Sequence, residues 1–209
     1  MEAPFTLYGT HLSGPTYKVA LMLALCERDF TYRHVDLDCL DHQQPDFLAI
    51  NRFGQVPALS HGGLTLCESG AILEYLADLV GRFDGADRAT AARVREWLFW
   101  DADSLSPGIY RSRAFKREAT RTHLSIVEYF RKAGEAGLTV LNNNLGERGF
   151  LVGDAATIAD IACYGAVVYA PEAGYDLARW PKVIPWMCRI TELPHFRRPQ
   201  SLLPLEDAA

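Results

Sequence analysis

The stretch FTLYGTHLSGPTYKVALMLALC, residues 5–26, decides the fold. Its first part, Phe5–Tyr8, is a short apolar run that ends at Gly9, which predicts a buried strand. Its last part carries apolar side chains at the spacing i, i+3, i+4, i+7, namely Val19, Met22, Leu23 and Cys26. That spacing predicts one face of a helix. The chain therefore opens with a strand, a loop and a helix.

The rest of the first half continues this alternation of strands and helices. Residues Thr31–Leu37 alternate as in a second strand, and Pro45–Ile50 fits a short helix. Two short runs, Pro57–Ser60 and Leu64–Leu66, predict a hairpin through His61-Gly62-Gly63. A helix capped by Ser69 follows, with the apolar stripe Ile72, Leu73, Leu76, Leu79 and Val80. A β-α-β unit needs a parallel strand pair and a hairpin adds an antiparallel one, so the order is thioredoxin-like.

The second half is predicted to be all-helical. Helical spacing covers residues 88–104, 120–142, 157–170 and 182–191, with a break at Pro107-Gly108 and weak points at Gly134 and Gly137. Trp97, Phe99 and Trp100 are expected in the core. Thr157-Ile158-Ala159-Asp160 has the form of a capping box. We therefore expect a thioredoxin-like domain at 1–80, a linker at 81–87 and an all-helical domain at 88–209.

Composition excludes several classes of protein. The 209 residues suit one large or two small domains, and 49% apolar with 22% charged residues is an ordinary globular mix. With 26 acids against 21 bases, and 10 against 4 in residues 1–80, a basic nucleic-acid binder is not expected. Apolar runs are too short for a membrane span and the N-terminus lacks signal-peptide order. Five scattered cysteines without a Cys-x-x-Cys indicate a reducing, cytoplasmic setting without a metal.

The segment between the first strand and the first helix is where a thioredoxin-like fold carries its chemistry. Residues 12–18 contain no cysteine, which excludes dithiol exchange there. Ser13 is the hydroxyl that remains, at the expected start of a helix. It is either a simple N-cap or a donor to an anion at the positive end of the helix dipole.

Two more places have both a structural and a functional interpretation. Val56-Pro57 is either an ordinary entry into a strand or a turn whose backbone pairs with an extended peptide. Glu68-Ser69 is either a helix cap or a grip for an amino-acid head group, with the carboxylate accepting from an ammonium.

Taken in order, the motifs resemble the cytosolic glutathione transferase family, in its bacterial, theta-like, serine-type form. The resemblance covers essentially the whole chain and rests on four stretches: residues 7–15, residues 51–59, Glu68-Ser69 with residues 72–76, and residues 157–161. It implies a glutathione-binding thioredoxin-like domain, an all-helical domain that forms the wall for an electrophile, and a homodimer.

The resemblance also implies roles for particular residues. Ser13 matches the serine that hydrogen-bonds the sulfur of glutathione. The implied glutathione-binding residues are His42, Gln55, Val56, Pro57 as a cis-proline, Glu68, Ser69 and Asp103. The implied lining of the electrophile pocket is His11, Leu12, Tyr110 and Phe115, although the last two also fit a packing role. Departures from the family pattern are Pro15, where some relatives have Asn, and Arg52, where a proline is more usual.

The implied activity is the conjugation of glutathione, activated as a thiolate, to small hydrophobic electrophiles, as in detoxification. Glutathione is then a co-substrate, and no metal, nucleic-acid partner or membrane partner is expected. The alternatives are a non-catalytic ligand-binding or assembly module, and a glutathione-dependent isomerase, dehalogenase or peroxidase. Retention of Ser13, His42, Val56, Glu68 and Ser69 favours the enzyme.

Overall fold

A computed structural model describes residues 4–117, 123–146 and 149–205 of the chain. The chain divides into two compact units. The first, which we call the N-terminal unit, combines residues 1–81 with residues 193–209, and the second, the helical unit, spans residues 82–192.

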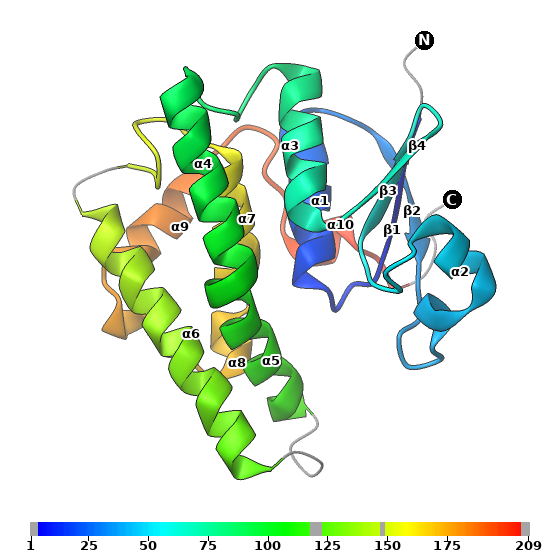
Figure 1. Ribbon diagram of the computed structural model, residues 1–209. Coiled ribbons are helices and arrows are strands. Elements are labelled where there is room, and N and C mark those ends of the chain that lie inside the picture. Colours follow the sequence, from blue (N-terminus) through cyan, green and yellow to red (C-terminus); the bar gives the residue numbers. More distant parts are fainter. Residues whose placement is uncertain (1–3, 118–122, 147–148, 206–209) are drawn as a thin grey trace. The chain divides into compact units, whose positions relative to one another are not determined.

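The N-terminal unit is built on a four-stranded mixed sheet, as the sequence predicts (Figure 1). Its strands are β1 (Phe5–Gly9), β2 (Phe30–His34), β3 (Ala58–His61) and β4 (Leu64–Cys67), in the order β2-β1-β3-β4. The β1–β2 pair is parallel, and the β1–β3 and β3–β4 pairs are antiparallel. The predicted thioredoxin-like arrangement is confirmed.

Helices cover both faces of this sheet. Figure 1 shows α1 (Gly14–Leu25) and α3 (Ser69–Val80) together on one face, and α2 (Pro45–Ile50) on the other side. Leu7 of β1 and Leu73 of α3 are fully buried in the core. One detail of the prediction is wrong: Ser69 is the first residue of α3, and Glu68 takes the N-cap position without a side-chain cap bond.

The C-terminal segment belongs to the N-terminal unit rather than to the helical half in which the sequence placed it. The Tyr17 hydroxyl of α1 donates to the Arg197 carbonyl at 2.9 Å. Leu202, in the short helix α10 (Pro199–Leu202), and Leu203 are buried. Burial of these side chains beside α1 explains why the segment follows the first unit and not the helices that precede it in sequence.

The helical unit begins with one long helical run. It consists of α4 (Arg88–Trp100), the π-helical segment η2 (Asp101–Leu105) and α5 (Ser106–Arg117). The break predicted at Pro107-Gly108 is wrong, because the helical run continues through both residues directly after the π-helical segment. The remaining elements are α6 (Leu124–Leu145), α7 (Ile158–Val167), α8 (Ala170–Ala173), η3 (Leu177–Arg179) and α9 (Val183–Thr191).

Helices α5 and α6 cross at two glycines. A Cβ atom added to Gly108 would lie 2.4 Å from the backbone nitrogen of Gly134, so the two backbones touch directly. The Tyr175 hydroxyl lies against the same crossing, donating to the Gly108 carbonyl at 3.2 Å. Gly134, predicted as a weak point of its helix, is thus a contact point where no side chain fits.

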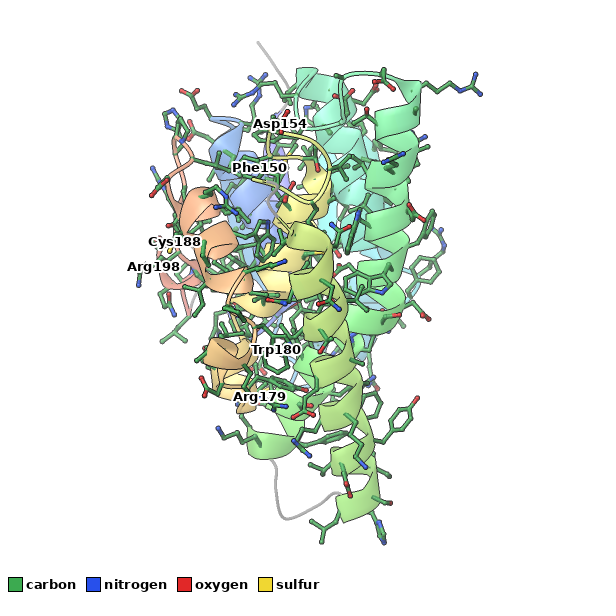
Figure 2. The ribbon with its side chains drawn as sticks, turned by 90° about the vertical axis from the view of Figure 1, so that its left-hand side faces the viewer. Phe150, Asp154, Arg179, Trp180, Cys188 and Arg198 are labelled. Carbon is green, nitrogen blue, oxygen red and sulfur yellow. The ribbon has the colours of Figure 1, made fainter. Side chains whose placement is uncertain are left out.

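The same helix is held from another side by the segment before α9. The Trp180 indole donates to the Thr139 hydroxyl at 3.0 Å, and Arg179 donates to the Glu135 carboxylate at 2.8 Å. Figure 2 shows both labelled side chains beside α6. Together with the glycine crossing, these contacts fix α6 in the unit.

The predicted capping box at the start of α7 is confirmed and extended. The buried Asp160 carboxylate accepts from the Thr157 backbone at 2.9 Å, and also from the Leu151 N–H and the Trp186 indole, each at 2.9 Å. Burial raises the pKa of the Asp160 carboxyl, and these donors oppose that rise. One carboxylate therefore joins the helix start to a preceding loop and to α9.

The prediction of an aromatic core at the end of α4 is partly wrong. The rings of Trp97 and Trp100 pack edge to face with centroids 4.9 Å apart, and both side chains are half-buried. Phe99 points out of the unit and is 75% exposed. Helical periodicity explains this, because Phe99 follows the buried Leu98 and so lies well round the helix from it.

The glycine crossing gives a test of the helical packing. Gly108→Ala would force the α5 and α6 backbones apart, so we expect a loss of about 3 kcal/mol or more in the free energy of unfolding. Urea unfolding followed by circular dichroism measures it. Gly137→Ala is the milder control, because an added Cβ there would lie 3.0 Å from the end of the Leu105 side chain and 3.3 Å from its Cα, so that a shift of a few tenths of an ångström accommodates it. Equal losses in the two variants would contradict the close crossing.

Candidate functional site

The pairing register of the sheet brings four chain segments together at one end of its strands, which we call the edge of the sheet. Tyr8 pairs with Ala58 and Ala58 pairs with Cys67, so Gly9, Pro57 and Glu68 leave the sheet at the same end. His34 ends β2 beside Gly9 at that end. The carboxyl ends of strands are where α/β folds bind ligands. Most of the residues predicted for binding lie at this edge or in the loops next to it.

Ser13 lies at this edge as the N-cap of α1, as predicted. Its Oγ accepts a hydrogen bond from the Thr16 N–H at 3.1 Å, and its own N–H donates to the Thr10 carbonyl at 3.0 Å. The side chain is half-buried. Because the capping bond uses a lone pair of Oγ, the hydroxyl hydrogen stays available to an anion at the helix N-terminus.

The loop before β3 is held in shape by Asn51. Its buried side chain donates to the Gln55 carbonyl and accepts from the Phe53 N–H at 2.9 Å. The loop leads into the Val56–Pro57 peptide bond, which is cis. No residue in 4–117, 123–146 or 149–205 forms a hydrogen bond with the Val56 backbone. The loop thus leaves the backbone N–H and C=O groups of Val56, which we call the Val56 edge, without a partner among the described residues.

Asn51 is a positioning residue that the sequence argument missed as such. The bond from Phe53 back to the Asn51 side chain is an Asx-turn, which Asn favours two residues before the bonded amide. Arg52, whose role the sequence left open, lies with its guanidinium 4.4 Å from the centroid of the exposed Phe53 ring. This is a cation–π contact on the outside of the loop.

Glu68 has an unusual backbone conformation between β4 and α3. Its φ of 69° lies in the left-handed region, which costs a non-glycine residue of order 1–3 kcal/mol. Its carbonyl accepts from the Ile72 N–H at 3.0 Å, so the residue starts the helix while its exposed carboxylate forms no cap. The strain places an acid next to the Ser69 amide and hydroxyl, at a second helix N-terminus.

His42 and Gln55 lie on the outer side of the same loop. His42 belongs to η1 (Asp41–Gln43), and a Cβ on Gly54 would lie 3.3 Å from the His42 carbonyl oxygen, so the two segments adjoin. The His42 Nδ1 atom is buried with no hydrogen-bond partner among the described residues. The Gln55 side chain is exposed. Both are polar groups next to the Val56 edge.

Cys67, the last residue of β4, carries a thiol next in sequence to Glu68 that favours its protonated form. Burial raises the pKa of the Cys67 thiol, the Arg52 charge lowers it, and the Glu68 charge raises it again. The Cys67 Sγ contacts the Ile50 carbonyl at 4.0 Å. A thiol with a raised pKa carries less thiolate, so Cys67 is a poor nucleophile.

The remaining predicted site residues are placed as follows. His11 stacks on His34 with ring centroids 5.8 Å apart, and Leu12 is half-buried. In the helical unit, Asp103 is exposed on the π-helical segment and accepts from the Ser104 hydroxyl at 3.1 Å. Tyr110 donates to the Gly165 carbonyl at 3.0 Å, and burial raises its pKa well above the ordinary value. Phe115 packs on Phe130 with centroids 5.8 Å apart.

The described residues hold neither a cluster of metal ligands nor a membrane-spanning helix. No three histidine, cysteine, aspartate or glutamate side chains in that part of the chain gather to hold a metal ion. No helix there has the length and apolar character needed to cross a membrane.

The chain matches two family models. The glutathione S-transferase N-terminal domain matches residues 3–78, and the glutathione S-transferase C-terminal domain matches residues 123–194. The first model includes all the candidate residues of the N-terminal unit described above.

Individual relatives agree with these models over most of the chain. Glutathione S-transferase 3 of Zea mays is 34% identical, over 97% of this chain and 96% of its own. The disulfide-bond oxidoreductase YfcG of Escherichia coli is also 34% identical, over 85% of this chain and 86% of its own. The crystal structure of a glutathione S-transferase from Pseudomonas fluorescens has a TM-score of 0.87 at 33% identity, covering 94% of this chain and 98% of that one.

Asn51 gives a test of how the Val56 edge is held. Asn51→Ala removes both side-chain bonds of the loop, so we expect about 1–3 kcal/mol lower stability and faster amide exchange at Phe53. Hydrogen–deuterium exchange with mass spectrometry measures the second effect. Gln55→Ala is the control, because only the backbone carbonyl of Gln55 takes part in the loop. Unchanged exchange at Phe53 in Asn51→Ala would show that the amide does not hold the loop.

Proposed function

Because this chain belongs to the glutathione S-transferase family, we propose that it binds glutathione, activates its thiol as a thiolate and conjugates it to small hydrophobic electrophiles. The observation that carries this proposal is the half-buried Ser13 hydroxyl at the N-terminus of α1. The five free cysteines of the chain favour a reducing, cytoplasmic setting, in which a thiol co-substrate is kept reduced.

Ser13 is proposed to stabilise the thiolate. A thiol with a pKa near 8.5 is only about 3% ionised at pH 7. A hydrogen-bond donor that favours the anion lowers the thiol pKa, and each unit is about 1.4 kcal/mol in favour of the thiolate. With the Oγ lone pair taken by the Thr16 N–H, the Ser13 O–H is oriented to donate to the sulfur, and the helix dipole adds to the effect.

The edge of the sheet supplies partners for the rest of the tripeptide. The Ser69 amide and hydroxyl suit the γ-glutamyl carboxylate, and the exposed Glu68 carboxylate suits its ammonium. The unpaired Val56 backbone, next to the cis-Pro57, suits the peptide groups of the cysteinyl residue. His42 and Gln55 suit the glycine carboxylate. Asp103 of the helical unit is proposed as a further polar contact to glutathione.

The reaction transfers no electrons to or from the protein. The thiol proton goes to solvent, the thiolate sulfur forms a bond to the electrophilic carbon, and a halide leaves or the carbon skeleton takes the added charge. The protein contributes a lowered thiol pKa and proximity of the two reactants. We propose His11, Leu12, Tyr110 and Phe115 as lining for the electrophile, with Phe115 also packing on Phe130.

A second candidate activity is the reduction of disulfides by glutathione. It is favoured by the 34% identity to a protein described as a disulfide-bond oxidoreductase. The same thiolate would attack a disulfide sulfur instead of a carbon, giving a mixed disulfide and a released thiol. Turnover of chlorodinitrobenzene against turnover of hydroxyethyl disulfide, both with glutathione, separates the two activities. Binding of glutathione with neither turnover would favour a non-catalytic module.

We further propose that the chain forms a homodimer. Each unit has large apolar side chains in solvent: Phe53, Leu64 and Leu79 in the N-terminal unit are 40–49% exposed, and Phe99 of α4 is 75% exposed. Removal of such side chains from water by a second copy stabilises association by about 25 cal/mol for each Å² buried.

The role of Ser13 is tested by the ionisation of bound glutathione. Ser13→Ala removes the donor to the thiolate, so we expect the pKa of the bound thiol to rise by about 1–2 units. The value of kcat/KM at pH 7 then falls about 10–100-fold, with little change in the dissociation constant of glutathione. Ultraviolet titration of the complex gives the pKa and steady-state kinetics gives the rate.

Two further variants make this test specific. Ser60→Ala, on the β3–β4 hairpin, is a matched serine substitution and should change neither the pKa of the bound thiol nor kcat/KM. Glu68→Ala should raise the dissociation constant of glutathione about tenfold with a smaller effect on the thiol pKa, since it removes a charged bond to the ammonium. Equal thiol pKa values in Ser13→Ala and in the unsubstituted protein would remove Ser13 from the mechanism.

The dimer is tested at Phe99. Phe99→Asp replaces the most exposed of these apolar side chains by a charge, so we expect monomers at micromolar concentration where the unsubstituted protein is dimeric. Analytical ultracentrifugation measures the state. Ile184→Asp is the control, because Ile184 is also an exposed apolar residue but belongs to α9 and not to α4. A dimer that persists in Phe99→Asp would exclude this face.

A further inference from the structure

Positive charge is concentrated in one part of this acidic chain. Residues 106–146 contain 7 bases and 3 acids, a net charge of +4, while the rest of the chain contains 14 bases and 23 acids, a net charge of −9. The basic part consists of α5, α6 and the segment that connects them. A local charge opposite to that of the whole chain marks this helical hairpin as a separate surface feature.

The end of the hairpin carries the bases that lack an acidic partner. Several charged side chains further along are paired, such as Arg113 with Glu172 at 2.7 Å and Lys132 with Glu128 at 3.0 Å. Arg111, Lys116 and Arg117 on α5 are exposed, and none of them is paired with an acid among the described residues. Their charge is therefore available to a partner.

Apolar side chains are exposed at the same end. Leu124 in the first turn of α6 is 83% exposed, Tyr129 is 67% exposed and Ile126 is about half exposed. The Phe115–Phe130 ring contact holds the end of α5 against the start of α6, so Lys116 and Arg117 belong to the same end of the hairpin as these three residues, with the Lys116 ammonium next to Gly174. In Figures 1 and 2 the lower end of α6 extends past the other helices of its unit.

We propose that this end of the hairpin, formed by Arg111, Lys116, Arg117, Leu124, Ile126 and Tyr129, docks on the surface of membranes rich in anionic phospholipid. Cations bind the headgroups, while leucine, isoleucine and tyrosine side chains enter the boundary between headgroups and acyl chains. A nucleic acid would use the charge but leave the apolar side chains in water. A lipid surface accepts both, and it needs no shaped groove to receive a projecting helix end.

This inference is independent of glutathione chemistry. The short apolar runs of the sequence argue only against a spanning segment, and a surface contact needs none. The proposal therefore replaces the expectation that the chain has no membrane partner, and it leaves the proposed glutathione chemistry unchanged.

The test is sedimentation of the full chain with vesicles of phosphatidylcholine alone and with a third of the lipid replaced by phosphatidylserine. We expect binding only to the anionic vesicles. Binding should fall markedly as NaCl is raised to 0.5 M, because the Debye length is then only about 4 Å and the charges are screened. Lys116→Glu/Arg117→Glu should reduce the partition coefficient at least about tenfold. Leu124→Ser/Tyr129→Ser should reduce it several-fold without changing the salt dependence.

Controls separate docking from folding and from other partners. Ile184→Ser removes an exposed apolar side chain of α9, elsewhere in the helical unit, and should bind vesicles as the unsubstituted protein does. If the charge-reversal variant fails to fold by circular dichroism, Lys116→Gln/Arg117→Gln takes its place. Equal binding to both kinds of vesicle, no binding to either, or full binding by both pairs of variants would overturn the proposal. So would retention on immobilised polyglutamate without vesicle binding, which would indicate an acidic protein partner.

Discussion

The pairing of Tyr8 with Ala58 and of Ala58 with Cys67 is the constraint on which the candidate site depends. It makes the end of β1, the start of β3 and the end of β4 meet at one edge. The register is fixed by burial, because Leu7 and Leu59 face each other across the same two strands and both are buried. A slip by one residue would turn these side chains to the opposite face. The hydrophobic core thus positions the polar edge.

Because the fold positions these polar groups, an anion site can be proposed in a unit that is acidic as a whole. Residues 1–80 carry only 4 bases against 10 acids. The donors at the edge are instead backbone amides and hydroxyls at the start of α1 and of α3, where helix dipoles point their positive ends. Such donors are held by the fold and do not depend on long flexible side chains. Under the proposed function, the acidic Glu68 adds selectivity for a ligand that also carries an ammonium.

Much of the fold was predictable from the sequence, because the elements of the N-terminal unit carry clear periodicity and clear turn residues. The succession of strands and helices followed from spacing alone, and the cap was one of the two interpretations of Ser13. Local patterns failed where a partner distant in sequence decides the outcome. The C-terminal segment packs beside Tyr17, and no local pattern points to it. Proline and glycine at 107–108 are breakers in an isolated helix, yet here the helical run continues through them and Gly108 packs directly against a glycine of α6.

The sequence analysis named the candidate residues of the site, which remain a prediction, but not the residue that holds the loop beside them. Ser13, Glu68 and Val56 were singled out as groups that a ligand could use. Asn51 was not, because a buried amide that holds a loop has no signal in composition or period, only in the Asx-turn that the structure shows. The helical unit extends this contrast. Its interior is fixed by contacts that exclude even a methyl group, whereas Phe99 and Leu124 on the outer faces of the same helices meet no such restraint. The outer faces are therefore free to acquire partners without a change of fold.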